Sequence, residues 1–113
     1  MKRYRGGAVW GLVLALSPSV ASAQVLYGSI VGNVNDPSGA AVVRASVTIT
    51  HQQTNQARQT TSNESGAYEF STVPSGGYTV LVTAPGFTSF TQNQVLVAIN
   101  NVTRVDVTLK VGA

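Results

Sequence analysis

The sequence has no cysteine among its 113 residues. A disulfide scaffold and a thiolate metal site are therefore excluded, because both need cysteine side chains. A bacterial lipoprotein is excluded as well, because a cysteine at the cleavage point carries its lipid. The fold must therefore be held together by apolar burial alone.

Charge is scarce, at 10% of the residues, and it is unevenly placed. Lys2, Arg3 and Arg5 form a basic start, and beyond Arg5 four basic and four acidic residues balance each other. The net charge of +3 therefore comes from the start of the chain. A nucleic-acid-binding domain needs a clustered basic surface, which the rest of the chain lacks, so we expect no nucleic-acid partner.

Residues for catalysis are equally scarce. His51 is the only histidine, whereas a metal site needs several convergent ligands, so we interpret it as a solvated residue at a strand end. Glu64 and Glu69 flank one turn, and we interpret them as solvated surface acids rather than a carboxylate pair. No nucleophile elbow, phosphate loop or zinc motif occurs. The sequence predicts no catalytic residue, no metal site, no cofactor and no enzymatic activity.

The first 23 residues have the order of a secretory leader. A basic start is followed by an apolar run over residues 8–16, a helix-breaking Ser-Pro-Ser and small residues at Ala21 and Ala23. A membrane-spanning helix needs about 20 apolar residues, and this run is about half as long. We therefore predict a helical signal peptide over residues 1–23, cleaved between Ala23 and Gln24. The mature domain, residues 24–113, is expected to have no membrane-spanning segment.

After Gln24, apolar and polar residues alternate, and turn residues recur at intervals typical of all-β domains. The short connections leave no room for crossover helices, so we expect antiparallel pairing. The prediction is a seven-stranded antiparallel β-sandwich of two facing sheets. The expected strands cover residues 26–34, 45–51, 57–62, 68–70, 78–84, 87–98 and 105–111.

Some details of these strands can be predicted as well. Leu81 makes the middle of its strand apolar on both faces, which favours a central position. The strand over 57–62 is polar and is expected at a sheet edge. A bulge is expected near residues 92–94. Turns are expected at residues 35–39, 63–66, 74–77 and 100–101, where Gly, Pro, Asn and Asp concentrate.

The turn motifs resemble a known family. Gly28–Gly39 is similar to the opening G-x-V-x-G-x-V-x-D-x-x-G of carboxypeptidase regulatory-like domains, and Ala45–Ile49 resembles the strand that follows it. Asn63–Phe70 resembles D-x-x-G-x-Y-x-F, Val73–Val80 resembles L-P-x-G-x-Y-x-V, and Ala84–Phe87 resembles A-x-G-F. The resemblance implies a transthyretin-like (prealbumin-like) β-sandwich.

The residues that carry this resemblance are types that form turns and cores, so they predict stability rather than chemistry. They are Gly32, Asp36, Gly39, Gly66, Tyr68, Phe70, Pro74, Gly76, Tyr78, Gly86 and Phe87.

A domain of this kind directly after a signal peptide resembles the start of TonB-dependent outer-membrane transporters. The resemblance implies an exported, non-catalytic accessory domain in the periplasm or at the outer membrane, or a secreted one. Its partner would be another protein or the rest of such a transporter. The alternative is a carbohydrate-binding module with a starch-binding-like sandwich. A sugar module should show an exposed aromatic platform, and an interaction module an exposed apolar patch or edge.

Overall fold

The computed structural model describes residues 26–112. The predicted signal peptide, with Ala21, Ala23 and Gln24 at its cleavage site, lies outside the described residues. The described part is all-β, as predicted, with β1 (Tyr27–Asn35), β2 (Ser46–His51), β3 (Ala57–Thr61), β4 (Ala67–Pro74), β5 (Gly76–Thr83), β6 (Phe90–Val97), β7 (Val102–Arg104) and β8 (Val107–Thr108).

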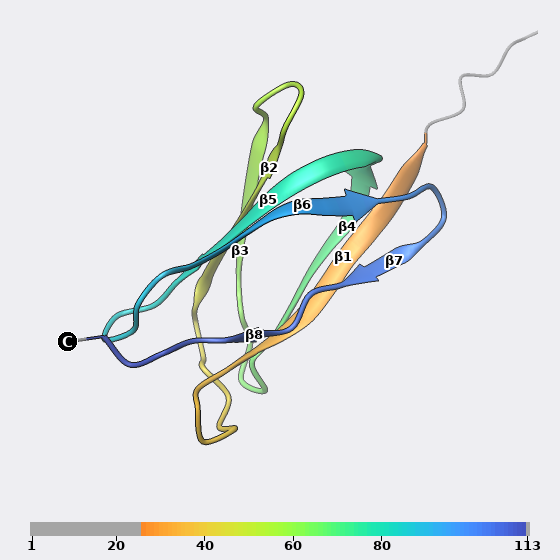
Figure 1. The fold of residues 1–113 in the computed structure, drawn as a ribbon. Coiled ribbons are helices and arrows are strands. Elements are labelled where there is room, and N and C mark those ends of the chain that lie inside the picture. Colours follow the sequence, from red (N-terminus) through yellow and green to blue (C-terminus); the bar gives the residue numbers. More distant parts are fainter. Residues whose placement is uncertain (1–25, 113) are drawn as a thin grey trace, which may run out of the picture.

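The strands form two sheets that pack on one core (Figure 1). The first sheet has the order β4-β1-β7, and β8 also pairs with β1. The second sheet has the order β3-β2-β5-β6. This β-sandwich is consistent with the transthyretin-like fold that the motifs imply.

The core follows the period-2 alternation of the strands. Buried side chains come from alternate positions, such as Ile30 and Val34 in β1 and Tyr78, Val80 and Val82 in β5. The outward Leu81 lies on the central strand β5, as predicted, and β3 lies at an edge. The predicted bulge is present in β6, where an extra residue faces β5 and Gln94 has a φ of 60°.

The predicted count of seven strands is wrong, because the predicted final strand over 105–111 contains only the short strand β8, and a further strand, β7, precedes it. Val105, Val107 and Leu109 point into the core as their alternation predicts. Val111, predicted to share that face, is 70% exposed. The predicted strand over 87–98 starts only at Phe90, because Phe87 forms an isolated bridge with Val111 and the two residues after it belong to no strand.

The expectation of purely antiparallel pairing is also wrong. β1 pairs with β4 in the antiparallel direction, but it pairs with both β7 and β8 in the parallel direction. The chain crosses from the second sheet to the first between β6 and β7, so the final strands run beside β1 in its own direction (Figure 1).

Gly32 makes this parallel arrangement possible. A Cβ atom at Gly32 would lie 1.8 Å from the carbonyl oxygen of Val105, in the segment between β7 and β8. The Val105 amide donates a hydrogen bond to the Val31 carbonyl at 2.9 Å, which holds the segment against β1. A side chain at position 32 would have to displace backbone rather than a flexible group.

Gly32→Ala should therefore lower the free energy of unfolding by about 3 kcal/mol or more, because the neighbouring backbone must move. The matched control is Gly39→Ala, where a Cβ would meet nothing within 4 Å and the φ of 90° alone is unfavourable. That control should cost about 1–2 kcal/mol. Urea denaturation of both purified variants measures the difference, and equal losses would contradict the close approach.

Candidate functional site

The motif residues Asp36 and Asn63 begin two equivalent turns. Asp36 Oδ1 accepts hydrogen bonds from the Ser38 amide at 2.8 Å, the Ser38 hydroxyl at 2.6 Å and the Ala40 amide at 3.0 Å. Asn63 Oδ1 accepts the corresponding three bonds from Ser65 and Ala67 at 2.9, 3.1 and 3.0 Å. An amide oxygen thus replaces the family's usual carboxylate without loss of a contact.

The motif glycines provide backbone conformations that side chains disfavour. Gly39, Gly66, Gly76 and Gly86 all have positive φ, of 90°, 79°, 138° and 85°. Gly66 also passes close to β1, since a Cβ there would lie 2.6 Å from the Val34 carbonyl oxygen. Gly39, Gly66 and Gly86 lie in turns or bends, as their sequence context predicts, whereas Gly76, expected in a turn over 74–77, is the first residue of β5.

The motif aromatics lie in the core. Tyr68, Phe70 and Tyr78 are buried, and both tyrosines use their hydroxyls on backbone. Tyr68 donates to the Val105 carbonyl at 2.5 Å, and Tyr78 donates to the Pro74 carbonyl at 2.7 Å. Burial raises the pKa of Tyr68 to about 12 and also raises the pKa of Tyr78.

Phe87, the last motif residue, is partly buried against the core and forms a bridge with Val111. The eleven motif positions are therefore distributed over turns and core. The structure does not bring them together into one site.

The acidic candidates of the sequence do not gather into a metal site within residues 26–112. Glu64 and Glu69 are exposed, as predicted. No group of three or more His, Cys, Asp or Glu side chains in this described range could hold a metal ion.

His51 is not the solvated residue that its strand-end position suggested, since it is only 9% exposed. Its ring packs edge-on against Tyr78, with 4.9 Å between ring centroids. Nδ1 accepts the amides of Gln53 and Thr54 at 3.2 and 3.4 Å, so Nε2 carries the proton and faces the Ser75 carbonyl at 3.3 Å. Nδ1 therefore holds the β2–β3 hairpin tip, and Nε2 joins His51 to the connection between β4 and β5.

A polar cluster joins β1 to the final segment. Arg104 forms a salt bridge with Asp106 at 3.0 Å and donates to Asn33 Oδ1 at 2.7 Å. Asp106 Oδ1 accepts the Asn33 amide at 3.0 Å. The hydrogen bond from Arg104 is the largest cause of a lowered pKa for Asp106. Both side chains of the salt bridge are more than half exposed, so it adds little to the free energy of unfolding. Its role is to position the segment between β7 and β8 beside β1.

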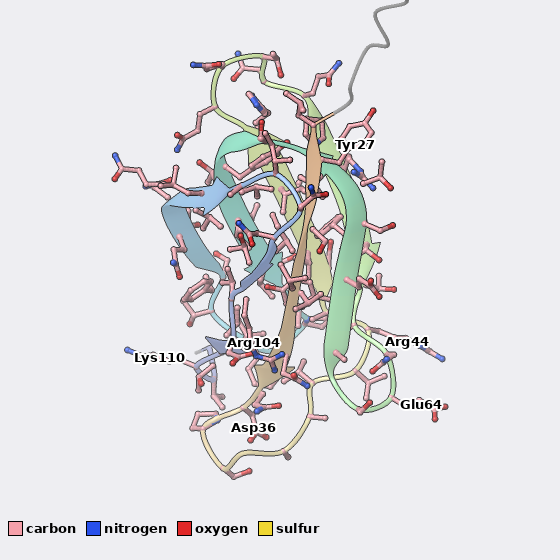
Figure 2. The ribbon with its side chains drawn as sticks, turned by 90° about the vertical axis from the view of Figure 1, so that its right-hand side faces the viewer. Tyr27, Asp36, Arg44, Glu64, Arg104 and Lys110 are labelled. Atoms are coloured by element: carbon pink, nitrogen blue, oxygen red, sulfur yellow. The ribbon has the colours of Figure 1, made fainter. Side chains whose placement is uncertain are left out.

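Five charged side chains lie toward the end of the sandwich opposite Tyr27 (Figure 2). Figure 2 shows the labelled charged side chains, from Asp36, Arg44, Glu64, Arg104 and Lys110, toward one end, and Tyr27 at the other. Five exposed apolar side chains lie at the Tyr27 end of the two sheets, and we call them the end patch: Leu26, Tyr27, Leu96, Ile99 and Val102. Tyr27 and Val102 point outward from the first sheet and Leu96 points outward from the second.

Backbone contacts bring the parts of the end patch together. The Asn100 amide donates to the Tyr27 carbonyl at 2.8 Å, and Val102 pairs with Ser29, two positions further along β1. Leu96 and Val102 are 72% and 65% exposed. The sequence interpretation missed this patch, although three consecutive apolar residues, Val95-Leu96-Val97, in an edge strand signal an exposed apolar side chain.

The outer face of the second sheet is the other surface of note. Thr48, Thr50, Thr79 and Thr91 surround Leu81, and Gln52 and Asn55 border them from the β2–β3 hairpin. Together these residues line a hollow of about 400 Å³, which we call the threonine hollow.

The carboxypeptidase regulatory-like domain family matches residues 29–110. The chain therefore belongs to this family, as its motifs indicated. No curated protein sequence matches the chain.

Solved structures share the fold at low sequence identity. The Bacillus anthracis TIE protein is 14% identical over 76% of this chain and 17% of its own, with a TM-score of 0.62. Hydroxyquinol 1,2-dioxygenase from Pseudomonas putida is 9% identical over 81% of this chain and 59% of its own, with a TM-score of 0.63. A proposed carbohydrate binding protein from Bacteroides uniformis is 18% identical over 72% of this chain and 40% of its own, with a TM-score of 0.58.

This chain thus spans between 17% and 59% of the length of these three proteins. Such likeness shows the fold alone. Within residues 26–112, no helix is long and apolar enough to cross a membrane.

The turns that begin at Asp36 and Asn63 predict how the stability of the domain depends on pH. Hydrogen bonds from the Ser38 hydroxyl and then from backbone amides lower the pKa of Asp36. Its contribution to stability is therefore present above its unfolded pKa of about 3.9 and is lost as the pH falls through its lower folded pKa. Asp36→Asn should keep the turn and remove this loss below about pH 4, as measured by urea denaturation at successive pH values.

The converse variant is the control. Asn63→Asp should add a second titrating turn and make the acid loss of stability steeper than in the unchanged protein. If Asp36→Asn loses stability in acid as steeply as the unchanged protein, the Asp36 contacts do not lower its pKa.

Proposed function

We propose that this protein is an exported, non-catalytic accessory domain that docks a protein partner through its end patch. The observation that carries the proposal is the exposure of Leu96 and Val102 at the same end of the domain as Tyr27. Exposed apolar side chains that gather at one place on a domain mark an interaction surface. The family membership and the lack of a metal or catalytic cluster among the described residues support an accessory role.

The finer proposal is that the domain is the N-terminal extension of a TonB-dependent outer-membrane transporter, in the periplasm or at the outer membrane. It rests on the order of the segments, a predicted leader followed at once by a domain of this family. The end patch lies where the described chain begins, so a partner docked there would sit beside the leader-proximal end of the domain.

Export makes a direct prediction. Cells that express the full chain should yield a mature protein whose first residue is Gln24, because Ala21 and Ala23 fit the small-residue cleavage pattern. Mass spectrometry of the exported fraction measures this. Ala23→Arg is the matched variant and should leave the precursor uncleaved, whereas an unchanged full-length mass for the original chain would contradict the predicted leader.

The transporter assignment is tested first on the coding DNA beyond the codon for Ala113. An open frame that continues into a plug and a long series of amphipathic strands is expected, and a stop codon at that point would overturn this assignment.

In the full-length protein, a photo-crosslinking residue at Leu96 should then form an adduct with the partner, which mass spectrometry identifies. The same residue at Glu64, an exposed position at the other end of the sandwich from Tyr27 (Figure 2), is the control and should not. Equal labelling from both positions would show that the end patch is not the docking surface.

Carbohydrate binding is the second candidate function. The shared fold of the Bacteroides uniformis protein supports it. Aromatic stacking does not, because Phe87 and Phe90 pack against the core and leave Tyr27 as the exposed aromatic of the described residues. A sugar site in this domain would therefore need a surface other than an aromatic platform.

A further inference from the structure

The threonine hollow lies on a sheet face that is almost without charge. Among the residues of β2, β3, β5 and β6, Arg58 is the one Lys, Arg, Asp or Glu. Its guanidinium turns away to β4, where it donates to the carbonyls of Ser71 and Thr72 at 3.0 Å each and lies 5.8 Å from the Phe70 ring centroid. A charged ligand would find no opposite charge on this face.

The hollow instead presents hydroxyl and amide groups at fixed positions around an apolar floor. Strand register places Thr50 opposite Thr79, and Thr48 opposite Leu81. Leu81 in turn lies opposite Thr91 on β6. The hydroxyls therefore occupy neighbouring strands, about 4.8 Å apart, around a Leu81 side chain that is 38% exposed.

Side-chain hydrogen bonds orient part of this array. The Gln52 amide faces Thr79 Oγ1 at 3.5 Å, and the Thr79 hydroxyl donates to Asn93 Oδ1 at 3.2 Å. Gly77 leaves the room for Gln52 to lie on the sheet, since a Cβ there would come within 2.7 Å of Gln52 Oε1. The amide of Gln52 is thus held over the face rather than extended into water.

We propose that the threonine hollow binds a neutral, hydroxyl-rich glycan. Hydroxyl and amide side chains can both donate to and accept from sugar hydroxyls, and an apolar floor can cover the C–H face of a sugar ring. The absence of charge on the face argues against phosphate-bearing, sulfated or uronic acid ligands. The inference deepens the second candidate function and is independent of the end patch.

The test is an NMR titration of the isotope-labelled full chain with three neutral probes, cellohexaose, maltohexaose and chitohexaose. At least one should shift the amide signals of Thr48, Thr79 and Leu81, with a Kd on the order of 1 mM because the contacts are few and exposed. Binding should not change between low and high salt, since no charges pair. Hexagalacturonate, which is charged, should bind more weakly.

Two variants place the site. Thr79→Val removes the central hydroxyl and keeps the branched shape, and Gly77→Ala displaces the flexible end of Gln52. Each should weaken binding roughly fivefold to tenfold, while thermal unfolding shows that the fold is retained. Thr108→Val, in the neighbouring hollow that Phe90 lines, is the control and should bind as the unchanged protein does.

The outcomes separate the inference from the proposals it accompanies. If none of the three neutral probes binds, or if hexagalacturonate binds best, the inference is wrong. If a neutral probe binds but shifts signals around Phe90 or Tyr27, carbohydrate binding stands and the assignment to the threonine hollow falls. Shifts around Tyr27 would place sugar binding at the end patch; the other results leave the end patch to the crosslinking experiment.

Discussion

The contact on which the sandwich most depends is the close approach of the final segment to Gly32. Because Gly32 has no side chain, the Val105 carbonyl can lie over β1 and accept the Tyr68 hydroxyl at 2.5 Å. The Val105 amide is bonded to Val31 at the same point. These contacts direct Val105, Val107 and Leu109 into the core, where all three are buried. Without this approach the first sheet would keep the β1–β4 pair and lose the strands that close the core on its other side.

Local chemistry predicted the turns and the inward faces of the strands, because both depend on near neighbours in the sequence. The direction of β7 and β8 was missed for the opposite reason. Short connections govern strands that follow each other, whereas β1 and β7 lie more than sixty residues apart in the sequence. His51 was missed because its burial depends on Gly76, where a Cβ would come within 2.6 Å of Nε2. No local pattern shows that a glycine in another strand leaves room for that ring.

The family motifs proved to describe the scaffold and not a site. Their glycines, asparagine, aspartate and aromatics form turns and core, and they leave the outward positions unspecified. The end patch and the threonine hollow both occupy such positions. The three-residue apolar run in β6 could have indicated the patch. The hollow could not have been predicted from strand propensity, because threonine is common in strands for reasons of backbone conformation alone.

The parallel pairing also determines how the domain would respond to mechanical force. The described chain enters β1 at one end of the sandwich and leaves past β8 at the other (Figure 1). A pull on these two ends would slide β1 against β7 and β8 along their length, because the strands point the same way. Their hydrogen bonds would be loaded together in shear and would not open one after another, as they do when a hairpin is unzipped. The geometry makes this small domain a stiff tether between whatever is attached to its two ends.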